Sequence, residues 1–256
     1  MYRPTSKINK FWHILLYTIV CYAAIASPAW AVITVVDYTS TTSTDSTNVT
    51  TRSINSTGAN LLVVIVADFD PNTIGTLSDS KSNTWTARPS CAPGGPTNAG
   101  RVTTYYATSS PTVGSGHTFS YSGTNTYPGI AVIALSGAAT SSPFDQEDCN
   151  GTTGGAATTT TTGSITPGAN NEILVSGIGL TLAGSASIDS SFTIPTQTAY
   201  AGNGYGIALA YKIQTTLGFE NPTWTLPGSS DATANITTFK YNPVSAVVRH
   251  RPLVLQ

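Results

Sequence analysis

Residues 60–69 read NLLVVIVADF, and this stretch decides the fold class. Its apolar residues, rich in β-branched side chains, follow one another too continuously for a half-exposed strand. We therefore predict a strand buried at the centre of a sandwich. Residues 130–136 (IAVIALS) form a second buried run, and residues 172–180 (EILVSGIGL) follow the same pattern.

The segments around these runs also favour strands. Clusters of Gly, Pro, Asn and Ser separate them, at the spacing typical of an all-β sandwich or barrel. Beyond residue 31 we find no stretch with the 3.6-residue periodicity of an amphipathic helix. The sequence predicts an all-β fold, a jelly-roll-like β-sandwich of two antiparallel sheets. The further strands are predicted at 32–38, 101–107, 117–122, 192–200, 205–214, 223–226 and 235–241.

The chain also resembles itself at a distance. The sequence GAN followed by LLVVIVA at 58–67 is similar to GAN followed by NEILVSG at 168–177, an offset of 110 residues. Residues 118–120 (TFS) match residues 223–225 (TWT) at an offset of 105. The offset changes slowly, as it would if the loops of two repeats differed in length.

We therefore predict two similar half-units, at about 58–137 and 168–241. Together they would form one sandwich domain over residues 32–241. Two separate small domains are the alternative. A half of about 75 residues with short strands would bury little surface on its own, which favours the single domain.

Composition excludes several classes of protein. Of the 256 residues, 43 are Thr and 28 are Ser, while only 9% are charged. A coiled coil or a charged helical bundle needs far more Glu, Lys and Leu. The net charge of −1 and the lack of a basic cluster predict no nucleic-acid partner. The 40% of apolar residues can bury a core, so the chain is not disordered throughout.

The first 31 residues have the organisation of a secretory signal peptide. Three basic residues precede an apolar run at 11–26, and Ala29 and Ala31 stand at the −3 and −1 positions of a cleavage site. A membrane anchor is the alternative, but the run is shorter than the roughly 20 residues that span a bilayer. Cleavage after Ala31 predicts a secreted protein, extracellular or at the cell surface, without stable membrane insertion.

Cleavage at that point leaves two cysteines, Cys91 and Cys149. In an exported chain two cysteines most simply form one disulfide. Both lie in loop-like sequence, so we expect the bond to tie two surface loops together. A metal or redox pair is the alternative, but neither cysteine has a His or a second Cys nearby to complete such a site.

Two Thr-rich segments, 39–51 and 152–163, are predicted to lie outside the core. They could form exposed edge strands, a glycosylated surface or loops. The TTTTT run at 158–162 favours an exposed edge strand, because Thr is a good strand former. Residues 242–256 are predicted to be a C-terminal tail.

Few residues could carry catalysis. A glycoside hydrolase needs two carboxylates on opposite sides of a sugar. Beyond residue 31 the chain has only Glu147, Glu172 and Glu220, which are the candidate catalytic residues of a glycan-active enzyme of the hydrolase or lyase type. His117 has no accompanying G-x-S-x-G motif, so hydrolysis by a Ser-His-Asp arrangement is not predicted.

Oxygen-bearing side chains at alternate positions indicate a calcium site. Asp68, Asp70 and Asn72 hold the first, third and fifth positions of a loop whose twelfth position is Asp79. The sixth position is Thr73 instead of Gly, and the flanking segments are strands instead of helices. The alternative is a polar turn whose side chains cap their own backbone. Ca²⁺ is the one cofactor that the sequence suggests.

Residues 79–85 (DSKSNTW) resemble the D-S-x-x-N-T-[WY] turn that recurs in secreted bacterial and phage-associated β-sandwich modules. The strands at 58–67 and 131–137 are also similar to that group, whose function is largely unknown. The resemblance covers most of 58–241, and its motifs are structural. It implies a jelly-roll-like fold and a surface setting, with no catalytic residues to transfer.

Aromatic residues supply a binding hypothesis. Trp85, Tyr105, Tyr106 and Trp224 are candidate ligand-binding residues, because exposed Trp and Tyr rings stack on sugars. The alternative is that they fill the core of the sandwich.

The sequence therefore predicts a secreted, non-catalytic surface or carbohydrate-recognition module, with a polysaccharide or a cell-surface glycan as partner. A glycan-active enzyme on the same scaffold is the first alternative. A structural protein of a fibre, sheath or virion is the second, because Thr-rich edge strands could assemble by strand addition.

Overall fold

The computed structural model describes most of the chain between residues 32 and 243. All of these residues except Pro243 belong to one compact unit, Ala31–Asn242. The predicted signal peptide and nearly all of the predicted tail lie outside the described residues. The described residues are 32–43, 47–68, 74–92, 100–107, 111–124, 126–152, 157–200, 202 and 205–243.

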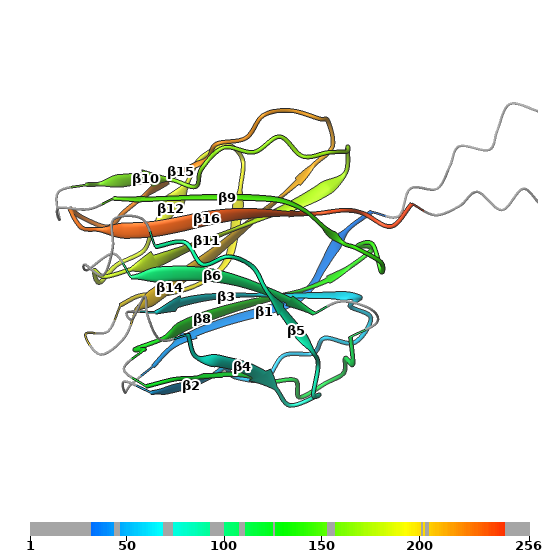
Figure 1. Ribbon diagram of the computed structural model, residues 1–256, viewed down its shortest axis with the longest axis horizontal. Helices are drawn as coiled ribbons and strands as arrows, with labels where there is room; N and C mark the ends of the chain where they lie inside the picture. The colour runs from blue at the N-terminus through cyan, green and yellow to red at the C-terminus, as the bar shows by residue number, and fades with distance from the viewer. Residues whose placement is uncertain are drawn as a thin grey trace, which may run out of the picture. The chain divides into compact units, whose positions relative to one another are not determined.

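The part of the chain that the structure describes forms sixteen β-strands and no helix (Figure 1). The strands are β1 (Thr34–Thr42), β2 (Asn48–Thr50), β3 (Leu61–Asp68), β4 (Thr76–Asp79), β5 (Trp85–Ala87), β6 (Arg101–Ala107), β7 (Phe119–Ser122), β8 (Gly129–Ser136), β9 (Phe144–Thr152), β10 (Thr159–Thr161), β11 (Glu172–Leu180), β12 (Ser187–Ile188), β13 (Thr193–Thr198), β14 (Gly206–Gln214), β15 (Thr223–Thr225) and β16 (Ala232–Phe239).

The strands form two halves with the same topology. Half 1 contains β1 to β8, with a five-stranded sheet in the order β1-β8-β3-β6-β5 and a three-stranded sheet in the order β2-β7-β4. Half 2 contains β9 to β16, with the orders β9-β16-β11-β14-β13 and β10-β15-β12. Each strand of half 1 therefore corresponds to the strand eight places later. All pairings within the sheets are antiparallel. The prediction of an all-β sandwich of two similar halves is confirmed, but the halves are built from four antiparallel sheets instead of the two that we expected.

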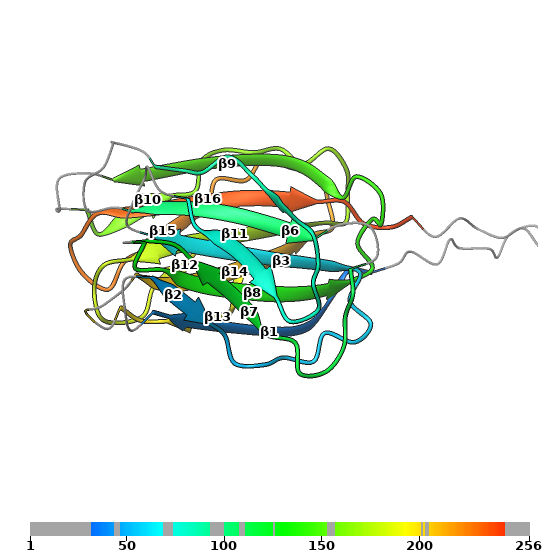
Figure 2. The same ribbon diagram turned by 60° about the horizontal axis from the view of Figure 1, so that its bottom comes forward.

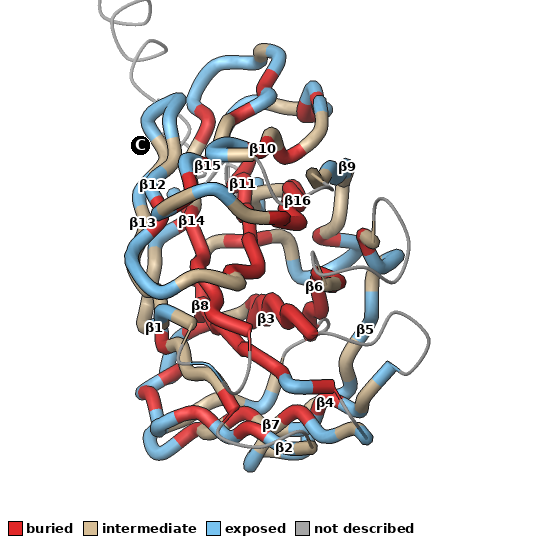
Figure 3. The backbone as a smooth tube through the Cα atoms, turned by 90° about the vertical axis from the view of Figure 1, so that its left-hand side faces the viewer, coloured by how far each residue is buried: buried red, intermediate tan, exposed pale blue. Residues whose placement is uncertain are grey.

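The four sheets stack in four layers. The two five-stranded sheets face each other across one apolar core, and each three-stranded sheet covers the outer side of its own half across a further core (Figure 3). On β3, Leu61, Val63 and Ile65 enter the central core, while Leu62 and Val64 enter the core of half 1. The run at 60–69 is continuous because both of its faces are covered by other sheets.

The outer sheets are covered on one side only, so inward and outward side chains alternate between buried and exposed along their strands. In half 1 the inward side chains of paired residues are Val49, Tyr121 and Leu77. In half 2 the corresponding positions are Thr160, Trp224 and Ile188. Trp224 is thus the counterpart of Tyr121, whereas the sequence match between 118–120 and 223–225 pairs it with Phe119, two residues earlier. A shift of two residues leaves the same face inward, so the apolar pattern alone does not distinguish the two alignments.

Each half begins earlier than the repeat indicated. β1 and β2 complete half 1, and β9 and β10 complete half 2, so the halves run over 34–136 and 144–239. The Thr-rich segment at 39–51 also contributes buried positions, since Thr39 and Thr51 are almost fully buried. The second Thr-rich segment supplies β10, an edge strand of the outer sheet of half 2, as predicted.

Two kinds of contact hold the halves together. At one edge of the stack β1 and β13 meet through hydroxyls, with Ser40 Oγ 2.6 Å from Thr196 Oγ1 (Figure 2). Near the centre, Gly177 allows the sheets to approach, because a Cβ at this position would lie 2.3 Å from a side-chain carbon of Ile65. Beside it, the Asn235 amide donates to Thr104 Oγ1 at 2.8 Å. The interface is therefore mainly apolar, with hydrogen bonds both at its edge and buried near its centre.

Candidate functional site

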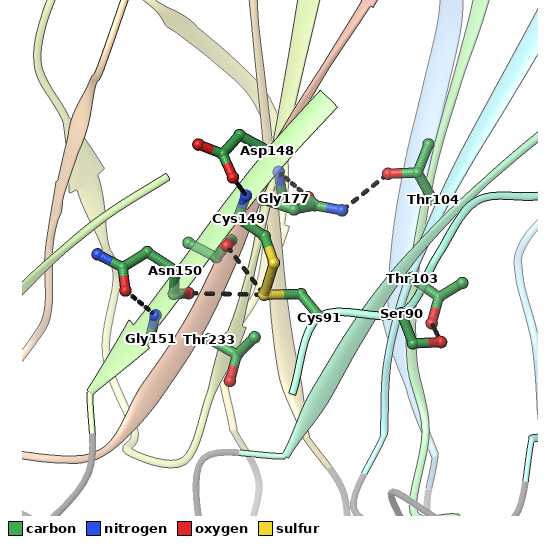
Figure 4. Close-up of a disulfide and its surroundings, with 12 residues drawn as sticks. Ser90, Cys91, Thr103, Thr104, Asp148, Cys149, Asn150, Gly151, Gly177 and Thr233 are labelled. Carbon is green, nitrogen blue, oxygen red and sulfur yellow. Dashed lines mark hydrogen bonds between the residues drawn. A yellow bond between two sulfur atoms is a disulfide. The ribbon is translucent and has the colours of Figure 1, made fainter. Parts of the chain in front are cut away.

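The predicted disulfide between Cys91 and Cys149 is present and links the two halves (Figure 4). Cys91 pairs by backbone bonds with Val102 of β6, whereas Cys149 lies within β9. Cys91 is buried and Cys149 is exposed. The bond thus joins half 1 to half 2, where the sequence had suggested a tie between two surface loops. It indicates that the protein folds in an oxidising environment.

A small cavity of about 170 Å³, lined by both polar and apolar groups, lies beside the disulfide. Ser90, Glu147, Asp148 and Thr237 contribute polar groups to its lining. These groups are bonded within the protein: Ser90 Oγ lies 2.9 Å from Thr103 Oγ1, and Asp148 accepts from the Ser164 amide at 2.7 Å. The cavity is smaller than the roughly 300–1,000 Å³ of sites that enclose drug-sized ligands. It is therefore suited to a small polar group at most.

The three candidate catalytic glutamates lie in different surroundings. Glu147 on β9 forms a two-pronged ion pair with Arg88, with N···O distances of 2.7 and 3.0 Å. Glu220 accepts from Lys212 Nζ at 2.6 Å. Glu172 is fully buried at the start of β11. A retaining or inverting pair needs two carboxylates open to the same sugar, and the buried Glu172 does not meet that requirement.

The DSKSNTW segment is organised by one buried carboxylate. Asp79 Oδ1 accepts from the Lys81 amide at 2.7 Å, and Oδ2 accepts from the Trp85 indole at 2.8 Å. Asn83 donates to both oxygens, from its side chain and from its backbone. The motif is therefore a carboxylate-centred turn, in which Asn83 and Trp85 both donate to Asp79.

His117 extends this turn into a Ser-His-Asp arrangement that the sequence did not indicate. Its Nε2 lies 3.0 Å from Asp79 Oδ1, and its Nδ1 lies 2.8 Å from Ser56 Oγ. Burial lowers the pKa of His117, and the hydrogen bond and charge of Asp79 partly oppose this. Ser56 and His117 are both fully buried, so the hydroxyl cannot reach a substrate. Residues 56, 79 and 117 are too far apart in the sequence for any motif to join them.

The Asp79 network yields a stability prediction. We expect Asp79→Asn to lower the free energy of unfolding by about 2 kcal/mol, because an amide nitrogen must then face buried donors. Asp189→Asn is the matched control, since Asp189 is exposed and accepts through Oδ1 alone. Urea denaturation of both variants measures the difference, and equal losses would show that the network is not a special source of stability.

The predicted calcium ligands do not converge within the described residues. Asp68 pairs with Arg101 at 2.7 Å and accepts from the Tyr121 hydroxyl at 2.8 Å. Asp79 accepts hydrogen bonds within the turn at 79–85. Asp70 and Asn72 lie outside the described residues. Over the described ranges, no group of three or more His, Cys, Asp or Glu side chains could hold a metal ion.

The predicted aromatic platform is mostly interior. Tyr105, Tyr106 and Trp224 are buried, and Trp85 is half-buried. Tyr106 stacks on Phe144 across the interface between the halves, and the Trp224 indole donates to Ser176 Oγ at 2.8 Å. Three of the four rings therefore present no face to a ligand at the surface.

The outer sheets carry a different surface pattern. In half 1 the outward positions pair in two rows, Asn48–Ser122–Thr76 and Thr50–Ser120–Ser78. In half 2 the rows are Thr159–Thr225–Ser187 and Thr161–Thr223. These eleven residues are exposed or half-buried, and none of them is charged. We call the two sets the hydroxyl faces of half 1 and half 2.

Each hydroxyl face repeats its groups at regular intervals. Neighbouring strands place them about 4.8 Å apart, and alternate residues of one strand about 7 Å apart. Because the outer sheets lie at opposite ends of the stack, the two faces point in opposite directions (Figure 3). The sequence signal for four of these strands was a polar-apolar-polar triplet, visible as NVT, TLS, SYS and TWT, whereas residues 159–161 are TTT and carry no such signal.

In comparisons with protein-family models, curated proteins and solved structures, nothing matches this chain. The resemblance to secreted β-sandwich modules therefore stays a prediction from the sequence. A separate observation concerns membranes: the described residues contain no helix long and apolar enough to span one.

Proposed function

We propose that this protein is a secreted, non-catalytic module that recognises neutral polysaccharides through its hydroxyl faces. The observation that carries the proposal is the composition of these faces. Ten of the eleven outward positions are Ser or Thr, and the remaining one is Asn48.

The chemistry of the faces suits a polyhydroxylated partner. A hydroxyl both donates and accepts hydrogen bonds, so a row of hydroxyls can match sugar hydroxyls of either orientation. Sheet faces without charge favour a neutral partner over an anionic or cationic one, because no ion pair offsets the loss of its hydration. Many weak contacts repeated over an ordered surface add up to useful affinity.

The state of the carboxylates supports a non-catalytic role. Glu147 and Glu220 are held in ion pairs, and Glu172 is buried. In the cavity beside the disulfide, Asp148 accepts hydrogen bonds from the backbone amides of residues 149 and 164. None of these groups stands free opposite a second one in an open cleft.

The proposed setting is the outside of the cell. The disulfide is consistent with this, because such bonds persist in oxidising compartments. The predicted signal peptide at 1–31 provides the route of export.

A pull-down with insoluble polysaccharides tests the proposal. We expect residues 32–256 to be depleted from solution by neutral glucans, mannans or chitin and not by anionic or cationic polymers, with no sugar released. Binding to the neutral polymers should persist at high salt, since surface ion pairs are screened there and hydroxyl contacts are not. Release of oligosaccharides would instead establish the enzyme, and depletion by none of the neutral polymers would refute the proposal.

A further inference from the structure

Two buried oxygen atoms on neighbouring strands lack a hydrogen-bonding partner. They are Oε2 of Glu172, on β11, and Oε1 of Gln214, on β14. Both side chains are at least nine-tenths buried. An unpartnered buried acceptor destabilises the folded state, so two of them on neighbouring strands require an explanation.

The sheet register places these two residues side by side. Glu172 and Gln214 are direct partners in the β11–β14 ladder. Side chains of directly paired residues project from the same face, with Cβ atoms about 5 Å apart. This lies well within the reach of a Glu and a Gln side chain.

Rotation of the Gln214 amide does not remove the problem. Its Nε2 donates to the Gly218 carbonyl at 2.9 Å and lies 3.5 Å from Glu220 Oε1. Exchange of the amide oxygen and nitrogen would place an acceptor against both of these acceptors. The orientation with Oε1 unpartnered is therefore the one that the surroundings require.

We infer that Glu172 is held as a neutral carboxylic acid at mildly acidic pH, where an exposed glutamate is ionised, and donates its proton from Oε2 to Gln214 Oε1. A single O–H group then satisfies both unpartnered oxygens. The other oxygen, Oε1, continues to accept from the Ala169 amide at 3.0 Å.

The charges around Glu172 agree with this assignment. Burial, followed by the negative charge of Asp145 on β9, raises the pKa of Glu172 to about 7. Hydrogen bonds with Thr238 and with the Ala169 amide oppose this rise, and a hydrogen bond with Asp145 adds to it. Lys240, beyond β16, reaches Asp145 at 3.7 Å, and Lys212 on β14 is paired with Glu220. Neither lysine forms an ion pair with Glu172 among the described residues.

The hydrogen bond between protonated Glu172 and Gln214 would hold two segments of the chain together at one end of half 2. The segments before β11 and after β14 are joined here: the Asn171 amide donates to the Gln214 carbonyl at 2.7 Å, and Ile165 and Glu220 exchange backbone bonds at 2.9 Å. Loss of the proton would leave a buried carboxylate facing an amide oxygen and near Asp145. We expect this end of half 2 to loosen as the pH rises through about 7.

The sign of the effect follows from the raised pKa. The folded protein keeps the proton that the unfolded chain loses at about 4.5. The stabilisation is therefore complete below that pH and is lost as the pH rises through about 7. A shift of this size corresponds to a change of roughly a hundredfold in the unfolding equilibrium constant.

The first test is the pH dependence of unfolding by urea between pH 5 and 9. We expect the unfolding constant of Glu172→Gln to change roughly a hundredfold less over this range than that of the wild type. Glu147→Gln, which removes an ion-paired carboxylate, is the control and should keep the wild-type dependence. Asp145→Asn should move the transition to lower pH, because the charge that opposes ionisation of Glu172 is gone.

The second test needs no variant that might fail to fold. The carboxyl carbon of Glu172 in the wild-type protein is followed by NMR as a function of pH, and its midpoint should lie near 7. Amide exchange at Asn171, corrected for its intrinsic pH dependence, should accelerate above that midpoint. A midpoint below pH 5 would mean that the carboxylate is ionised and shares a water molecule with Gln214, which overturns the inference.

Discussion

Replacement of both cysteines, Cys91→Ser together with Cys149→Ser, is expected to lower the free energy of unfolding by about 4 kcal/mol. The disulfide closes a loop with a sequence separation of 58 residues, and the chain-entropy model assigns a loss of this size to its removal. The bond also joins β9 of half 2 to the segment beside β6 of half 1. Its loss should therefore weaken the contact between the halves as well as enlarge the unfolded ensemble.

Urea denaturation without reductant measures this change, and reduced wild-type protein is the control that carries no substitution. The two should unfold at the same urea concentration. A loss below about 1 kcal/mol would show that the halves are held by their apolar interface alone.

Trp224→Ala is expected to cost about 4 kcal/mol, because removal of a large buried aromatic side chain leaves a cavity. The side chain is fully buried between the outer sheet and the five-stranded sheet of half 2. Its indole also bonds Ser176, whose hydroxyl would lose a partner.

Trp224→Phe separates the structural role of this residue from a role in binding. We expect a smaller loss of stability and unchanged adsorption to polysaccharide, because the ring does not reach the surface. Wild-type stability in Trp224→Ala, measured by thermal and urea denaturation, would contradict the burial of this side chain. Loss of adsorption in a stable Trp224→Phe would restore Trp224 as a ligand-binding residue.

The sequence indicated most strands but not how the sheets are layered. The run at 60–69 shows that both faces of a strand are covered, and it carries no information about what covers them. In a sandwich of two sheets each sheet keeps one face toward solvent, so a strand that is apolar on both faces fits the observed four layers and not the two sheets that we expected. The repeat was visible because many inward-facing positions are apolar in both halves. Shifting the alignment of the halves by two residues leaves the same face of each strand toward the core, so the apolar pattern does not determine that alignment.

The contacts of the candidate site residues depend on residues that lie far apart in the sequence. The pairing of Cys91 with Cys149 followed from their number, whereas its role between the halves required the topology. The turn at 79–85 was recognisable as a motif, but its partner His117 comes from a distant strand. Glu172 was chosen as a catalytic candidate for its residue type alone. Its partner Gln214 emerged only from the pairing of β11 with β14.

The hydroxyl faces show why the aromatic hypothesis was attractive from the sequence. In a triplet such as TWT, the aromatic residue is the more conspicuous member, yet alternation sends it inward and leaves the two Thr side chains outside. For Trp224, the residues proposed to meet a ligand are therefore its two sequence neighbours, Thr223 and Thr225.

The most direct measurement is an adsorption isotherm on the neutral polysaccharide that the wild type binds, made with lysine on both hydroxyl faces. The variant carries Thr76→Lys and Ser122→Lys in half 1 and Thr159→Lys and Thr225→Lys in half 2, all at exposed positions. The control carries Thr140→Lys and Ser141→Lys on the exposed connection between the halves. We predict at least about tenfold weaker adsorption for the face variant, equivalent to about 1.4 kcal/mol, and wild-type adsorption for the control. Equal adsorption of the face variant and the wild type would contradict recognition through the hydroxyl faces.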